Sequence, residues 1–223
     1  NDLYPEIKKR SLSGEYAETM AWDLVRHDMM HRFGYYITES SEHTAEYTPY
    51  YIKRNYPELI DRYKVPLDEY LRRCVRQINN WKTLREKVLS TDIEHTKTWE
   101  YASKIMKAVV TDEPFRVHGN VQNTGLITNL PRNACVEVPC MIDRNGVTPC
   151  YVGDLPEQCA AINRTNINVQ NMTILAAHER RKELVYMAAY LDPHTSSELS
   201  MDEIKSMCDD LFEAHKDWIP QYK

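Results

Sequence analysis

The chain has 223 residues, of which 42% are hydrophobic, so it is long enough to bury a sizeable core. Lysine and arginine number 28 against 33 acidic residues, which gives a net charge of -5. This balance excludes a protein that gains its affinity from neutralising nucleic-acid phosphates. The sequence shows neither an apolar run of membrane-spanning length nor a secretory signal pattern, so we expect no membrane partner.

Six cysteines occur in the sequence, and none of them forms the C-x-x-C pair typical of zinc ribbons. They are Cys74, Cys135, Cys140, Cys150, Cys159 and Cys208. A chain with an adequate core does not need disulfides for stability. The pattern therefore predicts reduced, mostly buried thiols in a cytoplasmic protein.

Helical periodicity dominates the first half of the chain. Apolar residues recur at helical spacing over 14–33, and Gly34 follows where a left-handed C-terminal cap is expected. A polar, aromatic connection extends to Pro57. The pattern then predicts a long helix over 67–89 and a shorter one over 99–110.

The middle of the sequence changes to strand patterns. Apolar and polar residues alternate over 115–121, as in a half-buried strand. Two further strands are predicted within 134–156, joined at Asn145-Gly146, which is a strong hairpin signal. This region therefore predicts a small antiparallel sheet.

Helices return after the predicted sheet. Apolar periodicity indicates helices over 155–176 and 183–191, and Ser200 with Glu203 forms a capping box ahead of a last helix. Helices flanking a small antiparallel sheet define an α+β fold, which we interpret as one domain over 1–223.

Several catalytic motifs are absent from the sequence. Its six glycines form neither G-x-G-x-x-G nor G-x-x-x-x-G-K-[ST], and no G-x-S-x-G is present. The chain therefore carries no recognisable phosphate-binding loop, and a dinucleotide would have to bind mostly elsewhere. The N-glycosylation triplets at Asn163 and Asn171 fall within a predicted helix, so we interpret them as chance matches.

The stretch "HDMMH" places His27 and His31 four residues apart on a predicted helix. That is the spacing of a zinc-binding H-E-x-x-H motif, but Asp28 stands where the glutamate would be. We interpret the two histidines as the border of an amphipathic face and keep a zinc hydrolase as an alternative.

The segment after Gly34 is too polar for a core and too aromatic for an ordinary loop. Aromatic faces stack on sugar rings, and carboxylates and imidazoles bind hydroxyl groups, so this composition indicates a sugar site. Its six candidate residues are Tyr35, Tyr36, Glu39, His43, Glu46 and Tyr47.

A second polar segment, "NVQNTGLITNLP", carries amide side chains around Gly125. The amides are Asn120, Gln122, Asn123 and Asn129. Such a turn can hold a polyol or the edge of a cofactor, and we expect Asn123 and Asn129 to do so. Amide-rich turns also serve as plain backbone caps, which remains the alternative.

Four stretches together resemble the C-terminal half of family 4 glycoside hydrolases, most closely the α-galactosidase (melibiase) branch. They are "HRFGYYITESSEHTAEY", "GNVQNTGLITNLP", "CVEVPCMIDRNGVTPCYVGDLP" and "INRTNINVQNMTILAA". The resemblance extends over nearly the whole chain. It implies the C-terminal domain of a glycosidase related in fold to lactate and malate dehydrogenases, without its N-terminal Rossmann domain.

The resemblance also implies an unusual mechanism and two cofactors. Members of the family use NAD⁺ and a divalent metal, usually Mn²⁺, in place of the usual pair of carboxylates. Oxidation at C3 acidifies the C2 proton, a base removes it, the leaving group is eliminated, water adds and the hydride returns. The expected metal ligands and glycine loop belong to the Rossmann half, so we expect both cofactors mainly there.

Site residues follow from the same resemblance. It implies that Tyr36 or Tyr35 is the C2 base, with Glu39 and His43 as sugar contacts or an alternative base. Because free tyrosine has a pKa of about 10, a tyrosine base would need a nearby positive charge.

We expect the chain to be a piece of an α-galactoside-cleaving enzyme that is inactive by itself and assembles as a homo-oligomer, possibly with a Rossmann-domain half. The alternative is a non-catalytic domain that serves oligomerisation or complements a separate chain.

Overall fold

The computed structural model describes residues 2–15, 20–90 and 96–223. These residues form two compact units. Unit 1 comprises Asn1–Val65, Gln122–Cys135 and Val152–Lys223, and unit 2 comprises Pro66–Val121 and Val136–Tyr151. The sequence predicts one domain over residues 1–223. The structure groups its residues into two units, each with its own internal contacts.

Short helices make up the first part of unit 1. They are α1 (Tyr4–Leu12), the 3₁₀ helix η1 (Ala21–Asp23), α3 (Leu24–Phe33), α4 (Ser41–Tyr47) and α5 (Glu58–Tyr63). The predicted cap is confirmed, because Gly34 has φ +90° and its N–H donates to the Met30 carbonyl. Of the helix predicted over 14–33, the described part contains η1 and then α3 from Leu24, and residues 16–19 lie outside the described residues.

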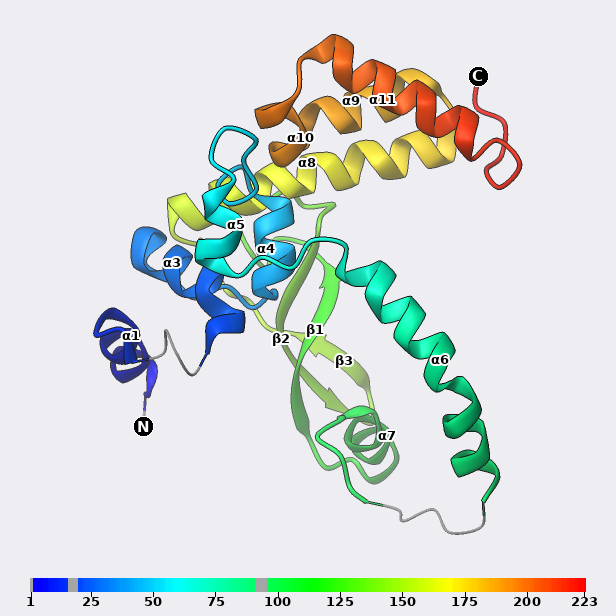
Figure 1. Ribbon diagram of the computed structural model, residues 1–223. Coiled ribbons are helices and arrows are strands. Elements are labelled where there is room, and N and C mark those ends of the chain that lie inside the picture. Colours follow the sequence, from blue (N-terminus) through cyan, green and yellow to red (C-terminus); the bar gives the residue numbers. More distant parts are fainter. Residues whose placement is uncertain (1, 16–19, 91–95) are drawn as a thin grey trace. The chain divides into compact units, whose positions relative to one another are not determined.

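The last part of unit 1 is a group of helices, α8 (Glu157–Glu179), α9 (Lys182–Leu191), α10 (Pro193–Glu198) and α11 (Met201–Ala214). Helix α9 packs against both α8 and α11 (Figure 1). The predicted capping box is confirmed at the start of α11, where Ser200 and Glu203 satisfy each other's backbone N–H groups.

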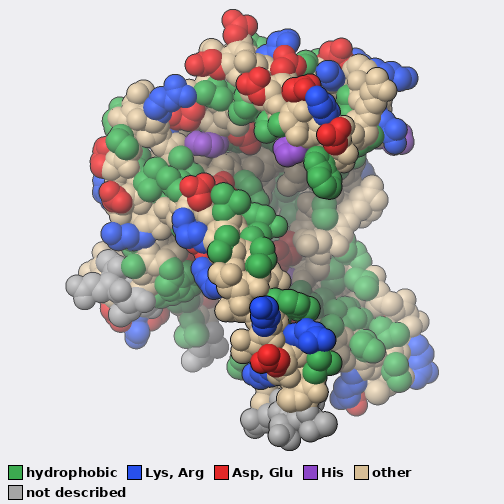
Figure 2. Space-filling model, turned by 45° about the vertical axis from the view of Figure 1, so that its right-hand side comes forward, with side chains coloured by type: hydrophobic (Ala, Val, Ile, Leu, Met, Phe, Trp, Pro, Cys, Tyr) green, Lys and Arg blue, Asp and Glu red, His purple; other side chains and the backbone are tan. Residues whose placement is uncertain are grey.

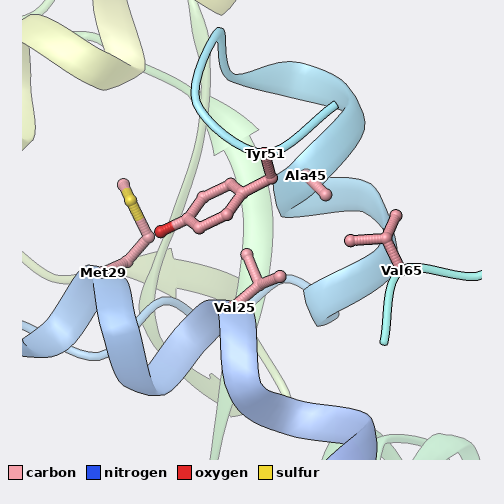
Figure 3. Close-up of a cluster of buried hydrophobic side chains, with 5 residues drawn as sticks. All are labelled: Val25, Met29, Ala45, Tyr51 and Val65. Atoms are coloured by element: carbon pink, nitrogen blue, oxygen red, sulfur yellow. The ribbon is translucent and has the colours of Figure 1, made fainter. Parts of the chain in front are cut away.

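A hydrophobic cluster joins α3 to α4 in unit 1. Its buried members are Val25, Met29, Ala45, Tyr51 and Val65, whose side chains converge in Figure 3. The Tyr51 hydroxyl within this cluster donates to Asp28 Oδ2 at 2.9 Å, so its polar end is satisfied. This packing holds the C-terminal end of α3 near α4 and thereby fixes both ends of the connection 34–40.

Unit 2 contains α6 (Glu69–Leu89), α7 (Ala102–Thr111) and a small sheet of order β1-β2-β3. The strands are β1 (Phe115–Gln122), β2 (Cys135–Asp143) and β3 (Gly146–Pro149), of which the terminal residues Gln122 and Cys135 are counted with unit 1. Every second residue of β2 from Val136 to Ile142 is buried, which is the predicted alternation.

The predicted hairpin is confirmed, with a turn that differs in detail. Strands β2 and β3 are antiparallel, and Asp143 pairs with Gly146. Arg144 and Asn145 therefore form the turn, and only Gly146 has a positive φ, of +103°. The Asn145 N–H donates to Asp143 Oδ1 at 2.8 Å, and this hydrogen bond to the residue before the turn stabilises it.

Helix α6 confirms the long predicted helix, but its apolar stripe is exposed. Leu71 is 64% exposed, Ile78 72% and Trp81 57%. Elsewhere the surface is mixed, and Figure 2 shows acidic and basic side chains interspersed. No helix among the described residues is long and apolar enough to cross a membrane.

Three short helices, α4, α5 and α10, lie outside the helices that the sequence predicts. Each has six or seven residues, too few to display helical periodicity. Caps define two of them instead, because Ser40 accepts the His43 N–H and Asp192 accepts the Thr195 N–H.

The prediction of unpaired thiols is confirmed, since all six cysteines are free. The prediction that most are buried is wrong, because only Cys140 and Cys208 are. Cys135 shows the reason. It begins β2 on the face opposite to Val136, so strand alternation turns it outward.

Replacing Met29 by alanine tests the α3–α4 core. Met29 is 1% exposed, so Met29→Ala should lower the free energy of unfolding by about 2–5 kcal/mol through lost burial and a cavity. The matched control Met201→Ala removes a 66% exposed methionine and should change it by less than about 0.5 kcal/mol. Urea denaturation measures both, and equal effects would contradict this account of the core.

Candidate functional site

A pocket of about 450 Å³ lies in unit 1 between α8 and the chain from α3 to just past α4. One wall consists of Met29, Phe33, Tyr35, Tyr36, Ile37, Thr38, Glu39, Thr44, Tyr47 and Thr48. The other wall consists of Leu155, Pro156, Cys159, Ile162, Asn163, Asn166 and Gln170. Four of the six predicted sugar-site residues therefore line one pocket.

The first wall is shaped by two helix ends. Helix α3 stops at Gly34, and Ser40 caps the start of α4 by accepting the His43 N–H at 3.2 Å. The five residues between them are extended or bent, so their side chains project from the helix ends. The fixed end of α3 and the fixed start of α4 thus hold Tyr35 and Tyr36 in place.

Tyr36 is anchored by a buried carboxylate. Its hydroxyl donates to Asp23 Oδ2 in a short hydrogen bond, and Asp23 is fully buried. The other oxygen of Asp23 accepts from Arg26 Nε at 2.5 Å and from Ser41 Oγ at 3.1 Å. At the backbone, the Tyr36 N–H donates to Tyr4 Oη at 2.7 Å.

This environment holds the proton on Tyr36. Burial, followed by the hydrogen bond and the charge of Asp23, raises the pKa of Tyr36 above its ordinary value. The guanidinium of Arg26 lies 4.7 Å from the ring centroid and lowers the pKa, but by less than the other effects. Action as a base therefore requires positive charge beyond Arg26.

Tyr35, Glu39 and Tyr47 complete the polar and aromatic part of this wall. Both tyrosines are about half exposed, so their ring faces are accessible. Glu39 Oε1 accepts the Ser40 N–H at 2.7 Å, which orients the carboxylate. The set offers ring faces and an acceptor to a ligand.

His43 and Glu46 do not line the pocket. His43 Nδ1 lies 2.8 Å from Glu46 Oε2, and the imidazole stacks on Tyr47 with ring centroids 5.7 Å apart. The hydrogen bond that Glu46 accepts from the imidazole raises the pKa of His43. The pair supports Tyr47 from outside the cavity.

Thr44 lines the pocket, and its side-chain hydroxyl is buried without a hydrogen-bond partner. The residue is 2% exposed, and Oγ1 meets no donor or acceptor among the described residues. Buried polar atoms are nearly always satisfied, so an unsatisfied one in a cavity wall points to a ligand or to water.

The amide-bearing wall of α8 was missed by the sequence reasoning. Cys159, Asn163, Asn166 and Gln170 are spaced by four, three and four residues, which places them on one helix face. That polar stripe was the available signal. Its amides lie within the stretch "INRTNINVQNMTILAA", which carries the family resemblance but from which no site residue is predicted.

Asn123 and Asn129 use their amides for the backbone. Asn123 is fully buried, and its Nδ2 donates to three carbonyls, those of Ile127, Leu130 and Pro131. Its Oδ1 accepts two backbone N–H groups of the same loop. Asn129 exchanges two hydrogen bonds with the backbone of Leu155. The geometry favours the alternative of backbone caps over contact with a cofactor.

His27 and His31 both bind one serine. Ser11 Oγ on α1 lies 2.7 Å from His27 Nδ1 and 2.7 Å from His31 Nε2. Over residues 2–15, 20–90 and 96–223, no three His, Cys, Asp or Glu side chains are grouped as metal ligands. The geometry thus favours a hydrogen-bonded pair over a zinc site.

The fold matches that of a glycosidase of known structure. A 6-phospho-alpha-glucosidase from gut microorganisms, solved in complex with NAD and Mn²⁺, superposes on 100% of this chain with a TM-score of 0.68 and 21% identity. The match covers 52% of that structure. The expected α+β fold, that of a glycosidase C-terminal domain, is thereby confirmed.

The chain belongs to glycosyl hydrolase family 4, because the model of the family's C-terminal domain matches residues 1–195. It is 60% identical over 223 residues to the alpha-galactosidase of Bacillus subtilis and 35% identical over 209 residues to that of Rhizobium meliloti. It covers 51% and 42% of their lengths, so it spans about half of these relatives.

Removing the charge of Glu46 tests the cause of the His43 shift. Glu46→Gln should lower the pKa of His43, because the accepting carboxylate is the largest cause of the increase. The control Glu39→Gln removes only a weaker, longer-range charge and should lower it less. NMR titration of the imidazole measures both, and an unchanged pKa in Glu46→Gln would contradict the pairing. Since the folded pKa is raised, the pair's stabilisation is present below the unfolded pKa and is lost as pH rises through the folded one.

Proposed function

We propose that this chain forms the sugar-facing part of an NAD- and Mn²⁺-dependent α-galactosidase. The observation that carries the proposal is the pocket of unit 1, which combines Tyr36, held by a buried carboxylate, with aromatic and amide-bearing walls. Family membership and the 60% identity to an alpha-galactosidase support the reaction class.

The pocket has the chemistry that a sugar ring requires. The half-exposed rings of Tyr35 and Tyr47 offer faces for the C–H groups of a pyranose. Opposite them, α8 presents two asparagines and a glutamine that can bind hydroxyl groups. Thr44 Oγ1 supplies a further donor and acceptor that the protein itself leaves unused.

In this proposal Tyr36 is the group that removes the proton next to the oxidised carbon of the sugar. It lines the pocket, whereas its hydroxyl is fixed from behind by Asp23. Arg26 over the ring partly offsets the charge of a tyrosinate. Tyr35 is the second candidate for the base, and its greater exposure leaves it less firmly oriented.

The residues that the structure describes do not fit a metal or dinucleotide site. The described residues group no three metal-binding side chains, and the amide of Asn123 is already fully bonded. The sequence also lacks a glycine-rich phosphate loop. We therefore assign NAD and Mn²⁺ to the part of the enzyme that the longer relatives possess in addition to the matched half.

Joining the chain to that additional part tests the proposal. The fusion partner is the portion of the Bacillus subtilis alpha-galactosidase outside the matched region. We expect hydrolysis of p-nitrophenyl α-galactoside, with NAD⁺, Mn²⁺ and reductant, by the fusion and not by the chain alone. In the fusion, Tyr36→Phe should lower kcat by about 100-fold or more because the base is lost.

Tyr56→Phe is the matched control, because Tyr56 is exposed and lies outside the pocket. It should leave kcat unchanged. Turnover by the chain alone, or full activity of Tyr36→Phe, would overturn the proposed role.

Thr44→Val separates ligand binding from stability. Valine has the shape of threonine and lacks the hydroxyl, which has no protein partner here. Stability should therefore be unchanged or higher, while KM of the fusion rises several-fold for a lost hydrogen bond of about 1 kcal/mol. Thermal unfolding and steady-state kinetics measure the two effects, and an unchanged KM would remove Thr44 from the sugar site.

A second candidate function, oligomerisation, is favoured by the apolar stripe of α6. Leu71, Ile78 and Trp81 recur on one face of a 21-residue helix and are exposed. An interface with a second copy of this chain would bury them, and a stable one needs about 800 Å² from each partner.

Sedimentation velocity of the chain tests this candidate. A dimer that dissociates on Ile78→Glu but persists on Asn79→Glu would support it, because Asn79 lies off the stripe and receives the same charge. A wild-type monomer would contradict it.

A further inference from the structure

We propose that Asp23, His27, Ser11 and His31 form a proton relay that connects Tyr36 in the pocket to the protein surface. The role of Tyr36 as a base rests on the proposed function, whereas the relay rests on contacts within unit 1. None of these four residues lines the pocket, whereas Tyr36 does, so they lie behind its wall.

The groups follow one another in a line. The Tyr36 hydroxyl donates to Asp23 Oδ2, and the same oxygen lies 3.6 Å from His27 Nε2. This is an ion-pair distance rather than a hydrogen bond, so proton transfer at this step requires the two groups to approach. The opposite ring nitrogen of His27, Nδ1, lies 2.7 Å from Ser11 Oγ. Ser11 Oγ in turn lies 2.7 Å from His31 Nε2.

Burial changes along this line in the way that a relay requires. Asp23, His27 and Ser11 are all buried, whereas His31 is exposed. The proton path is therefore shielded for most of its length and opens to solvent at one end. Burial also lowers the pKa of His27, which favours the neutral imidazole as the resting form and the release of a transferred proton toward Ser11.

Each member both accepts and donates a proton. Asp23 takes the proton from the Tyr36 hydroxyl and passes it to His27 Nε2. His27 releases its Nδ1 proton to Ser11 Oγ while the serine hydroxyl proton moves to His31 Nε2. His31 then gives up a proton to water, so the net change is a tyrosinate at Tyr36 and one proton in solvent.

The identity of residue 11 matters for this path. Two imidazoles can exchange a proton only through a group that donates and accepts at the same time, and a hydroxyl does both. A purely structural link between two helices would need only one of the two hydrogen bonds. Ser11 makes both, at equal length.

Other charged and polar groups beside the line hold Asp23 in place. Arg26 Nε and Ser41 Oγ donate to its other oxygen, Oδ1, and leave Oδ2 to Tyr36 and His27. This division keeps one carboxylate oxygen for anchoring and the other for proton transfer.

The exchange of the Tyr36 hydroxyl proton with water tests the relay. The full 223-residue chain is observed by NMR without sugar, dinucleotide or metal, and the proton is assigned by its loss in Tyr36→Phe. Ser11→Ala breaks the path between the two imidazoles, so we expect exchange to slow by about tenfold or more. Ser11→Thr retains a hydroxyl and should restore the wild-type rate.

Two further variants keep the test decisive. Ser13→Ala removes an exposed hydroxyl from the end of the same helix, where it donates only to the Arg10 carbonyl, and should have no effect. His31→Phe removes the surface end of the path at an exposed position and should slow exchange as Ser11→Ala does, even if the latter were to disturb folding.

An unchanged exchange rate in His31→Phe, or in a folded Ser11→Ala, would overturn the relay. Because the measurement needs no substrate, it is independent of the glycosidase assay. Slowed exchange in the Ser11→Ala and His31→Phe variants, together with an inactive fusion, would support the relay and reject the proposed function. Unchanged exchange in these variants, together with an active fusion, would reject only the relay.

Discussion

The buried carboxylate of Asp23 is the constraint on which the pocket depends. An ionised carboxylate away from water is costly unless it is paired and hydrogen-bonded. Here Tyr36, Arg26 and Ser41 all donate to it. These donors come from α3, from the connection after it and from the start of α4, so satisfying one charge fixes the three pieces that form a pocket wall.

Much of the fold could be predicted because its signals are local. The αL cap at Gly34, the capping box of Ser200 and the alternation along β2 are each determined by a few neighbouring residues. Short helices such as α4 escape such reasoning because they are stabilised by packing, here through Ala45 in the core with Val25.

The candidate site was predictable on one side only. Composition identified Tyr36 and its neighbours because aromatic and acidic residues are concentrated there. The opposite wall, with Asn163 and Asn166, belongs to a helix that is more than a hundred residues further along the chain, and only tertiary structure brings it near. Asn123 shows the converse, since the same polar character that indicated a ligand satisfies a tight loop instead.

Helix α8 is supported by α9, and residues beyond the family match, which ends at residue 195, support α9 in turn. Helix α9 packs on α8, α11 packs on α9, and Lys223 exchanges backbone hydrogen bonds with Arg180 and Lys182. Substitutions in α11 or around Lys223 would alter the rigidity and width of the pocket, although none of these residues lines it. Enzymes of this kind can therefore differ in substrate preference even when their pocket-lining residues are the same.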